Sequence, residues 1–521
     1  MQHIDRFTFI GGSILLMVSL GGCTDETTEK EGPAPAIVGT TILGATILDG
    51  AGAPSFVADV RLQNDRIVAV GRLQPEAGDT VVEAAGLALA PGFIDTHSHA
   101  DSDILEKPDA RAAVSQGITT VVGGADGGSH LPLADFYAHL EETPAAVNVA
   151  SYAGHNTYRQ QVLADDFRRP ATETEIEEMR QLLQSDLEAG ALGLSTGLEY
   201  DPGIYSTTEE VIILAREAAA SGGRYTSHIR SEDRAFWEAI EETLTIGREA
   251  QIPVNVTHIK LAMQSSHGKA DQLLSQLDEA REQGIDVTAD IYPYTYWQST
   301  LEVLFPERDF ENPESARFAV TQVSTPEGML IAYFKPEPEL AGKTLAEIAT
   351  LRGSEPATVL MDLIGEAQQY RQATGEEDVE SVIAVSMSAA DIDRLFRWPF
   401  ANVCTDGELW GSHPRGYGSF PRVLGTYVRD RNVLSLEEAI HKMTERAALS
   451  AGLEDRGRIE PGMFADLVLF DPATVTDRAT TDEPHLDSEG ILKVWVNGQI
   501  VWDRGEVTDS RPGMVLRRAS S

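Results

Sequence analysis

The amino-acid sequence predicts an α/β fold: a TIM-like (β/α)8 barrel with a small composite β-sandwich and an inserted lobe. Between residues 91 and 300, β-rich segments alternate with amphipathic helical segments, which indicates a parallel sheet. The number of these units favours a closed barrel over an open doubly wound sheet. Both ends of the chain carry short β-rich runs instead, and the simplest packing places them in one sheet domain beside the barrel.

The first β-rich region covers residues 37–90 and reads as three short runs divided by turns. Asn64-Asp65 lies between two alternating runs, which is the pattern of a hairpin. The second region, residues 455–521, returns to short strands and contains an Asn497-Gly498 hairpin turn. We expect 37–90 and 455–521 to form the composite β-sandwich domain together.

The barrel is expected over residues 91–454. Its strands are expected to begin at Pro91 and to continue at 118–124, 145–155, 191–200, 224–229, 252–260, 285–294 and 401–411. Helices are expected at 172–190, 207–223, 235–251, 270–284 and 434–452. The first of these has a Thr-x-x-Glu capping box at Thr172 and Glu175 and a terminal Gly190. Residues 300–395 break the alternation and predict a lobe inserted between the seventh and eighth strands.

The first residues have the pattern of an export signal. Phe7 to Leu20 is apolar but too short for a transmembrane helix, and Leu-Gly-Gly-Cys23 then resembles the bacterial lipobox. We therefore expect a lipoprotein signal peptide at 1–23, lipidation of Cys23 and a polar tether at 24–36. The alternative is an ordinary signal peptide cut near a chance cysteine. We therefore expect an exported, membrane-anchored protein. In similar lipoproteins a residue such as Thr24 after the cysteine favours sorting to the periplasmic face of the outer membrane.

The composition limits the partners. The net charge of -41 argues against nucleic acid, because phosphate binding needs clustered lysines and arginines. An anionic substrate would then need a local positive group. The chain has two cysteines, Cys23 and Cys404. If Cys23 carries a lipid, Cys404 has no cysteine to pair with, so no intramolecular disulfide can form.

The sequence PGFIDTHSHAD contains the most informative pair of side chains. Successive residues of a strand point to opposite faces, so His97 and His99 point the same way. Two imidazoles from one strand end can converge on one metal ion.

Further candidate ligands follow the other predicted strands, at the ends where a parallel barrel places its chemistry. They are Asp126, His155, Glu199, His228, His258 and Asp406. Two divalent ions held by such a set would polarise a carbonyl and activate water, which predicts a hydrolase. Taken singly, each histidine could be structural, Asp406 could form a turn and Glu199 could cap a loop. Their recurrence on consecutive strand ends favours ligation.

Eight motifs extend this picture to nearly the whole chain: PGFIDTHSHAD, GITTVV, GALGLSTGLEY, YTSHIRSED, VTHIK, DIYPYTY, TDG with SHPRGYGSFPRVLG, and GRIEPGMFADLVLFD. In their order and spacing, residues 37–507 resemble the amidohydrolase superfamily and, within it, the N-acyl-D-amino-acid deacylase (D-aminoacylase) family. The resemblance implies a distorted barrel, a β-sandwich from both termini, and zinc-dependent hydrolysis of an amide on a D-amino acid.

One position departs from the family pattern. Typical members have a metal-binding cysteine in a Gly-Asn-Cys-Gly loop, where this chain reads Gly-Ala-Asp126-Gly. Other amidohydrolases take the bridging ligand from the end of the fourth strand, the place of Glu199. We therefore expect Glu199 to bridge the metals, with Asp126 as the alternative carboxylate. Zinc is the expected metal, as one or two ions, although a carboxylate also suits harder ions.

The expected metal ligands are His97, His99, Glu199, His228, His258 and Asp406. Asp406 is also the expected general base, which takes a proton from water and passes it to the leaving amine. Arg415 matches the family's carboxylate-binding arginine, with Tyr292 as its partner, unless Arg415 serves a structural salt bridge. His155 and His413 are further candidates for substrate contact or for orienting a ligand.

Two other functions stay open at this point. The same barrel could act on D-residue-containing dipeptides or on cyclic amides. A lipoprotein that only binds a ligand belongs to a different class, and retention of all six expected ligands argues against it. The metal content of the protein distinguishes a metal-dependent hydrolase from a binding lipoprotein.

Overall fold

The computed structural model describes residues 39–519. The predicted signal peptide at 1–23, the lipidation site Cys23 and the tether at 24–36 lie outside these residues. Within residues 39–519, none of the helices combines the length and the apolar character needed to cross a bilayer.

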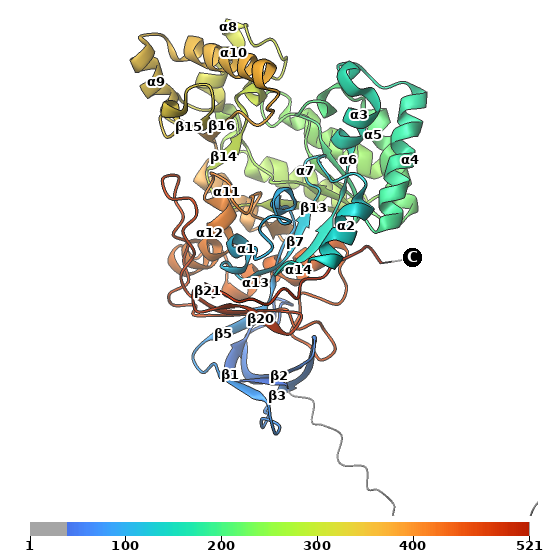
Figure 1. The fold of residues 1–521 in the computed structure, drawn as a ribbon, viewed down its shortest axis with the longest axis vertical. Coiled ribbons are helices and arrows are strands. Elements are labelled where there is room, and N and C mark those ends of the chain that lie inside the picture. Colours follow the sequence, from blue (N-terminus) through green and yellow to red (C-terminus); the bar gives the residue numbers. More distant parts are fainter. Residues whose placement is uncertain (1–38, 520–521) are drawn as a thin grey trace, which may run out of the picture. The chain divides into compact units, whose positions relative to one another are not determined.

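Parallel strands form the centre of the molecule (Figure 1). One sheet has the order β17-β13-β12-β11-β10-β9 and a second has the order β6-β7-β8. Their bounds are β6 (Phe93–Asp95), β7 (Ile118–Gly123), β8 (Asn148–Ser151), β9 (Ala153–Gly154), β10 (Gly193–Gly197), β11 (Arg224–His228), β12 (Val254–Val256), β13 (Val287–Ile291) and β17 (Ala401–Val403). Since β8 and β9 are one strand interrupted at Tyr152, eight strand positions result, and the predicted (β/α)8 barrel is confirmed in a distorted form.

The first and last barrel strands, β6 and β17, are not joined by a regular ladder. The loops that follow them make the connection instead. The Asp406 amide donates to the His97 carbonyl at 3.0 Å, and the His99 amide donates to the Gly407 carbonyl at 3.0 Å. We call this junction the seam of the barrel.

The predicted helices cover the outside of the strands. They are α4 (Glu173–Ala189), α5 (Thr208–Ala220), α6 (Phe236–Ala250) and α7 (Ala270–Glu282). The capping box of α4 is present, with Thr172 and Glu175 exchanging hydrogen bonds, and Gly190 ends the helix in a left-handed conformation. Apolar residues at helical spacing, such as Ile240 and Leu244 of α6, are buried in the main core.

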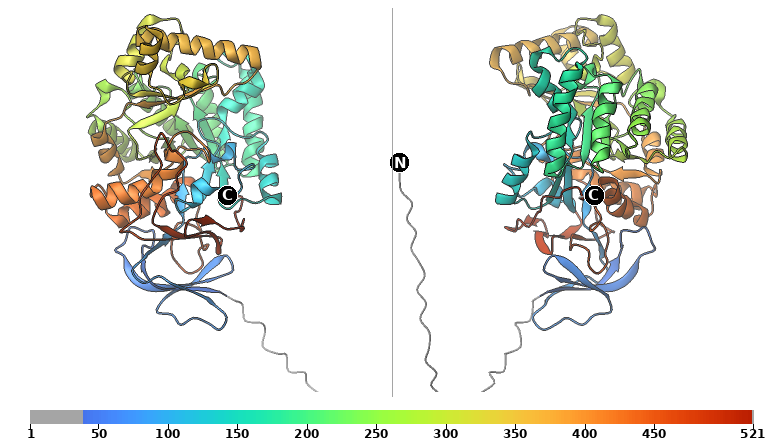
Figure 2. Two further views of the ribbon diagram at one scale, coloured as in Figure 1. Left: turned by 60° about the vertical axis from the view of Figure 1, so that its left-hand side comes forward. Right: turned by 90° about the vertical axis from the view of Figure 1, so that its right-hand side faces the viewer.

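Strands from both ends of the chain form one nine-stranded sheet, in the order β21-β20-β19-β18-β5-β1-β2-β3 with β4 beside β1 (Figure 2). The bounds are β1 (Thr40–Ile47), β2 (Phe56–Gln63), β3 (Arg66–Gly71), β4 (Thr80–Glu83), β5 (Ala88–Pro91), β18 (Leu467–Phe470), β19 (Ile491–Val496), β20 (Gln499–Asp503) and β21 (Glu506–Val507). Antiparallel pairing of β5 with β18 joins the two ends. Both predicted hairpin turns are confirmed, with Asn64 and Asn497 at positive φ.

A lobe with its own antiparallel sheet follows β13. Its strands, in the order β14-β16-β15, are β14 (Tyr296–Ser299), β15 (Met329–Phe334) and β16 (Glu380–Val385). The helices α8 (Pro313–Phe318), α9 (Leu345–Arg352) and α10 (Pro356–Thr374) cover it, at the end of the molecule away from β1–β3 (Figure 1). The sequence predicted an insertion here but not the 19-residue helix α10.

The predicted last helix, 434–452, is wrong in one respect. The segment forms two helices, α13 (Leu436–Met443) and α14 (Glu445–Ala451), separated at Thr444 with φ -130° and ψ -94°. The Thr444 hydroxyl donates to the Ile440 carbonyl at 2.7 Å and so replaces a main-chain hydrogen bond of the helix. Periodicity alone does not reveal such a break, because the apolar positions continue across it.

Candidate metal centre

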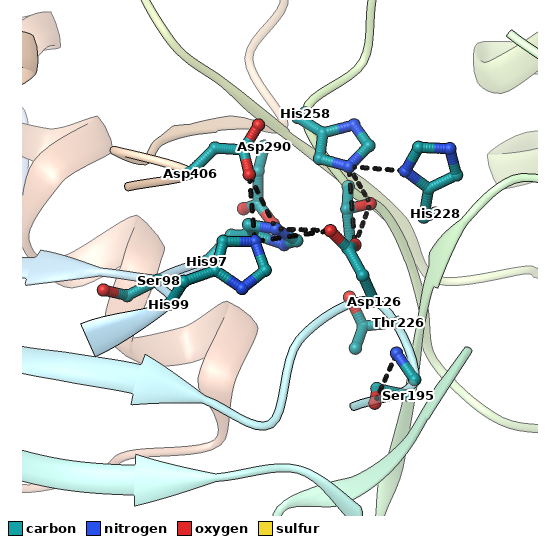
Figure 3. A network of polar contacts seen from close by, with 12 residues as sticks. His97, Ser98, His99, Asp126, Ser195, Thr226, His228, His258, Asp290 and Asp406 are labelled. Atoms are coloured by element: carbon teal, nitrogen blue, oxygen red, sulfur yellow. Dashed lines mark hydrogen bonds and ion pairs between the residues drawn. The ribbon is translucent and has the colours of Figure 1, made fainter. Parts of the chain in front are cut away.

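Four histidines converge at the carboxyl ends of the barrel strands (Figure 3). His97 and His99 follow β6, His228 is the last residue of β11, and His258 follows β12. All except His99 are nearly fully buried, and the side chain of His99 is 32% exposed. The strand ends of a parallel barrel thus bring together residues that lie 161 positions apart (97 to 258).

The first histidine pair faces two carboxylates. His97 Nε2 lies 3.5 Å from Asp126 Oδ2 and 3.3 Å from Asp406 Oδ1. His99 Nε2 lies 3.4 Å and 3.2 Å from the same two oxygens. The two imidazoles therefore point the same way, as the i, i+2 spacing predicts.

The second histidine pair faces the other oxygen of Asp126. His228 Nδ1 and His258 Nε2 are 3.0 Å apart, and His258 Nε2 is 3.4 Å from Asp126 Oδ1. Asp126 thus lies between the two pairs, with one oxygen toward each (Figure 3). Among the described residues three possible sets of donor atoms result, and Asp126 belongs to two of them: one with His97, His99 and Asp406, the other with His228 and His258. The third set consists of Glu199, His228 and Glu232.

These donor atoms suit a divalent cation. Bonds of about 2.0–2.1 Å around a tetrahedral zinc ion place neighbouring donors about 3.3 Å apart. The contacts of His97 and His99 with Asp126 and Asp406 span 3.2–3.5 Å, which matches this spacing. His97 Nε2 is buried and makes no hydrogen bond within the described residues. A donor set of imidazoles and carboxylates is also the one that zinc and similar ions prefer.

The structure places Glu199 beside the second histidine pair. Its Oε2 lies 2.9 Å from His228 Nε2, the ring nitrogen that points away from Asp126. Among the described residues, Glu199 shares a possible donor set with His228 and Glu232 but none with His97 or His99, whereas Asp126 meets both histidine pairs. Glu199 follows β10, the fourth barrel strand, and its Oε1 accepts from the Glu232 amide at 3.1 Å. The position between the two histidine pairs is thus occupied by Asp126, the alternative considered from the sequence, and the bridging role of Glu199 stays a prediction.

Two further residues around His258 were missed by the sequence analysis. Lys260 Nζ is 2.7 Å from His258 Nδ1, and Glu232 Oε1 is 3.2 Å from the same nitrogen. Lys260 also donates to Glu232. The i, i+2 spacing of His258 and Lys260 after β12 could have indicated Lys260, because such residues share a face. No comparable signal marks Glu232, which lies in a loop.

Three residues of this cluster have a left-handed backbone. Asp126, His258 and Asp406 adopt φ values of +51°, +34° and +50°, a region that residues other than glycine seldom occupy. Gly127 has φ +77°, and a Cβ there would lie 2.2 Å from Asn156 Oδ1. Strained backbone of this kind is held in place by the surrounding fold and is typical of functional sites.

The charges of the cluster are strongly coupled. Burial opposes ionisation, yet Arg415 and the histidines hold the pKa of Asp406 well below its usual range. The histidines do the same to the pKa of Asp126 despite its burial. Against its own burial, the two carboxylates raise the pKa of His97 to about 10. The cluster therefore favours positive charge at its centre, as a cation-binding site should.

The predicted substrate-binding arginine lies beside the cluster. Arg415 Nη1 donates to Asp406 Oδ2 at 2.6 Å, while its Nε is buried without a partner among the described residues. The Tyr292 hydroxyl is likewise buried and unpaired there, and the Arg415 guanidinium lies 5.2 Å from the centre of the Tyr292 ring. Two unpaired buried donors side by side imply an anionic partner, because burying such groups unpaired is costly.

The two remaining histidine candidates have other contacts. His155 is the first residue of α3 (His155–Leu163) and its Nε2 is 2.8 Å from Glu210 Oε1, which also accepts from Arg159. None of these three residues belongs to a possible metal-binding set among the described residues, and the substrate-contact or ligand-orienting role of His155 stays a prediction. His413 accepts from the Arg415 amide at 2.9 Å and donates to the Tyr296 carbonyl at 3.1 Å, which fixes the loop that carries Arg415.

A cleft with two chambers opens onto the cluster. Chamber A, about 630 Å³, extends from the histidines to Lys260 and to apolar residues of the segment after β13. Chamber B, about 840 Å³, extends from Asp406 and Arg415 toward the lobe and includes Tyr333, Asp378 and Glu380. Both chambers share His99, Asp126, Asp406 and Arg415, so the cluster lies where they meet.

Comparison with known proteins agrees with this arrangement. The model of the amidohydrolase family matches residues 80–401 and 342–502. D-aminoacylase of Alcaligenes xylosoxydans xylosoxydans is 37% identical over 92% of this chain and 98% of its own length. N-acyl-D-aspartate deacylase of the same organism is 38% identical over 95% and 97%. The crystal structure of N-acyl-D-glutamate deacylase from Bordetella bronchiseptica, complexed with zinc and a phosphonate inhibitor, superimposes with a TM-score of 0.82, 37% identity and coverage of 92% and 99%. The barrel, the histidine cluster and these matches agree, and the chain belongs to the amidohydrolase family.

Proposed function

We propose that the protein hydrolyses the amide bond of N-acyl-D-amino acids to a carboxylate and a free D-amino acid, with a divalent metal as cofactor. One observation carries the proposal: Asp126, flanked by two histidine pairs, lines the same cleft as Arg415, and the Arg415 Nε and the Tyr292 hydroxyl are buried without a partner among the described residues. A hydrolytic centre and a carboxylate-binding site thus adjoin. The similar proteins are deacylases of this substrate class.

The residues for the metal follow from the contacts. His97, His99 and Asp406 would hold one ion, His228 and His258 the other, and Asp126 both. Glu199 and Glu232 would orient His228 and His258, because each contacts the ring nitrogen that points away from Asp126. Zinc is the first candidate, as in the structure of the similar deacylase. With a carboxylate in place of a thiolate, harder ions are also suited to the site.

Asp406 is positioned to move the proton. A bound divalent ion would polarise the scissile carbonyl and make water more acidic. The ionised Asp406 carboxylate accepts the proton of the attacking water and passes it to the leaving nitrogen. Arg415 holds Asp406 Oδ2, so that Oδ1 stays directed at the cluster. The Arg415 Nε–H and the Tyr292 O–H then bind the substrate carboxylate and place the amide at the cluster.

A direct test combines two measurements on the full-length protein purified in detergent. Metal content is determined by elemental analysis, and release of free amine is followed for N-acetyl-D- and N-acetyl-L-amino acids. We expect one or two divalent ions per chain and D-selective release. Metal-loaded protein without turnover on any N-acyl-D-amino acid would overturn the proposal and direct attention to dipeptides and cyclic amides.

We also propose that the protein is exported and anchored by a lipid on Cys23. The support is the apolar segment Phe7–Leu20 followed by Leu-Gly-Gly-Cys. A Cys23→Ala variant should lose incorporation of labelled palmitate and leave the membrane fraction. Membrane fractionation and labelling that are identical for variant and wild type would contradict the anchor.

A further inference from the structure

We propose that chamber A receives the side chain of the D-amino acid and selects uncharged, apolar side chains over carboxylate-bearing ones. This inference rests on the proposed deacylase function and adds the substrate class. Chamber A is the part of the cleft in which apolar side chains and the cluster line one continuous space.

Part of the lining of chamber A is apolar. It consists of Ala262, Trp297, Val303, Leu304 and Val323, with Gln298 and Ser299 of the same lobe beside them. The indole Nε1 of Trp297 donates to Ser386 Oγ at 2.8 Å, so its polar atom is already satisfied. A leucine, methionine or phenylalanine side chain placed there would lose its contact with water, which stabilises the complex in proportion to the apolar area buried.

The cations of chamber A are already engaged. Among the described residues that line it, Lys260 and Arg415 are the only lysine or arginine, and three carboxylates beside the proposed ligands Asp126 and Asp406 also line it: Glu199, Glu232 and Asp233. Lys260 contacts Glu232 and His258, and Arg415 Nη1 contacts Asp406. The Arg415 Nε has no partner among the described residues, and the substrate α-carboxylate requires this guanidinium.

Arg308 near the chamber offers no second site. Its Nε donates to Asp201 at 3.0 Å and its Nη2 donates to the Glu199 carbonyl at 2.6 Å. The carboxylate of a D-aspartate or D-glutamate side chain would therefore enter an acidic, partly apolar space without a counter-ion. Burying an unpaired charge in this way is strongly unfavourable.

Sequence similarity does not decide this question. The chain is 37%, 38% and 37% identical to a D-aminoacylase, an N-acyl-D-aspartate deacylase and an N-acyl-D-glutamate deacylase. The lining of chamber A separates these possibilities because a side-chain carboxylate needs a cation and a neutral side chain does not.

The first experiment uses the wild-type protein and a panel of N-acetyl-D-amino acids. We expect kcat/KM for D-leucine, D-methionine and D-phenylalanine derivatives to exceed that for D-aspartate and D-glutamate derivatives by about 100-fold. Equal or higher kcat/KM for the acidic derivatives would overturn the inference but leave the deacylase function standing. Failure of every derivative would instead overturn the proposed function.

The second experiment introduces a cation into the wall. Val303 is half-buried, so Val303→Arg can be accommodated at the chamber. We expect the ratio of kcat/KM for N-acetyl-D-glutamate to that for N-acetyl-D-leucine to rise about 100-fold. The matched control is Val385→Arg, at a residue that is 49% exposed and does not line either chamber. An unchanged ratio in folded, metal-loaded Val303→Arg would contradict the assignment.

The acyl group is the competing occupant of chamber A. Its presence there would make kcat/KM depend on acyl length, from acetyl to octanoyl, and would make Val303→Arg alter that dependence rather than the side-chain preference. This pattern would overturn the inference. Measurement of both series on the same two variants therefore decides between the occupants, and the wild-type panel stays informative even where a variant does not fold.

Discussion

Asp126 differs from the other carboxylates of the centre because each of its two oxygens faces a different histidine pair. Glu199 contacts one histidine, at the outer nitrogen of His228, and accepts from the Glu232 amide. A residue that contributes to two donor sets cannot be replaced without loss to both. A residue that orients one imidazole affects the affinity of one ion only.

This difference is measurable. We expect Glu199→Gln to keep the number of bound ions but to weaken the affinity for one of them by about 10- to 100-fold, as loss of an orienting partner does. Asp126→Asn should lower the number of ions itself. Chelator competition and elemental analysis provide the readout, with Glu209→Gln on the surface as the control. Equal effects of Glu199→Gln and Asp126→Asn would restore Glu199 as a shared ligand.

The second prediction concerns the proton carrier. We expect Asp406→Asn to lower kcat by about 100- to 10,000-fold, since an amide cannot accept the proton. His97, His99 and Asp126 remain to hold an ion, so metal analysis should still find it. Steady-state kinetics on the metal-analysed variant is the test. Near-normal turnover with the metal bound would remove Asp406 from this role.

At the scale of single residues, the sequence predicts the donors that follow strands in a recognisable pattern. Alternation explains His97 and His99, and strand ends explain His228 and His258. The choice between Glu199 and Asp126 could not be made in the same way. It depends on the left-handed backbone at Asp126, which directs its carboxylate between the histidine pairs. The pattern of apolar and polar residues does not predict such a φ value.

At the scale of elements, the lobe contributes to the site as well as to the fold. β14 and the residues after it line chamber A, and β15 and β16 line chamber B. Periodicity predicted that the βα alternation stops here, since the segment lacks regular βα units. It could not show that the inserted sheet turns back over the barrel mouth, because that packing depends on contacts between residues far apart in sequence.

Glu380, the first residue of β16, makes the stability of the lobe depend on pH. Burial raises its pKa to about 7, although the Leu301 amide and Arg371 favour its charged form. The folded lobe thus binds a proton that the unfolded chain has released above about pH 4.3. The Glu380 contribution is fully present below that pH and is lost as pH rises through 7. The free energy of unfolding should fall by up to about 3 kcal/mol between pH 5 and 8 from this group.

Urea denaturation at several pH values tests this expectation. Glu380→Gln should flatten the decline above pH 5, because glutamine does not titrate. Glu376→Gln, at an exposed residue paired with Lys335, should leave the decline unchanged. The same slope in Glu380→Gln and wild type would show that Glu380 does not govern it.

At the scale of the whole molecule, the acidic surface is the dominant property. The chain carries 82 acidic and 41 basic residues, which gives the net charge of -41. Self-repulsion at this charge weakens the compact state, and salt screens it by shortening the Debye length from about 10 Å at 0.1 M to about 3 Å at 1 M. We expect Tm to rise by several degrees over about this range of sodium chloride. Differential scanning fluorimetry measures this, and an uncharged osmolyte at equal osmolality is the control. A Tm that does not respond to salt would contradict the expectation.

The seam of the barrel has a consequence for how the protein opens. His99 and Asp406, both at the metal centre, also donate the amide hydrogens that join the first and last strands, and Thr405 adds its amide to the Asp95 carboxylate at 2.8 Å. The loops that carry the proposed metal ligands therefore also hold the first and last strands of the barrel together. Hydrogen–deuterium exchange of the His99, Thr405 and Asp406 amides should slow together when metal is bound. An ion held by His97, His99 and Asp406 would also hold the two strand ends together. Loss of the metal and opening of the barrel at the seam would then occur together, as measured by metal analysis and by amide exchange.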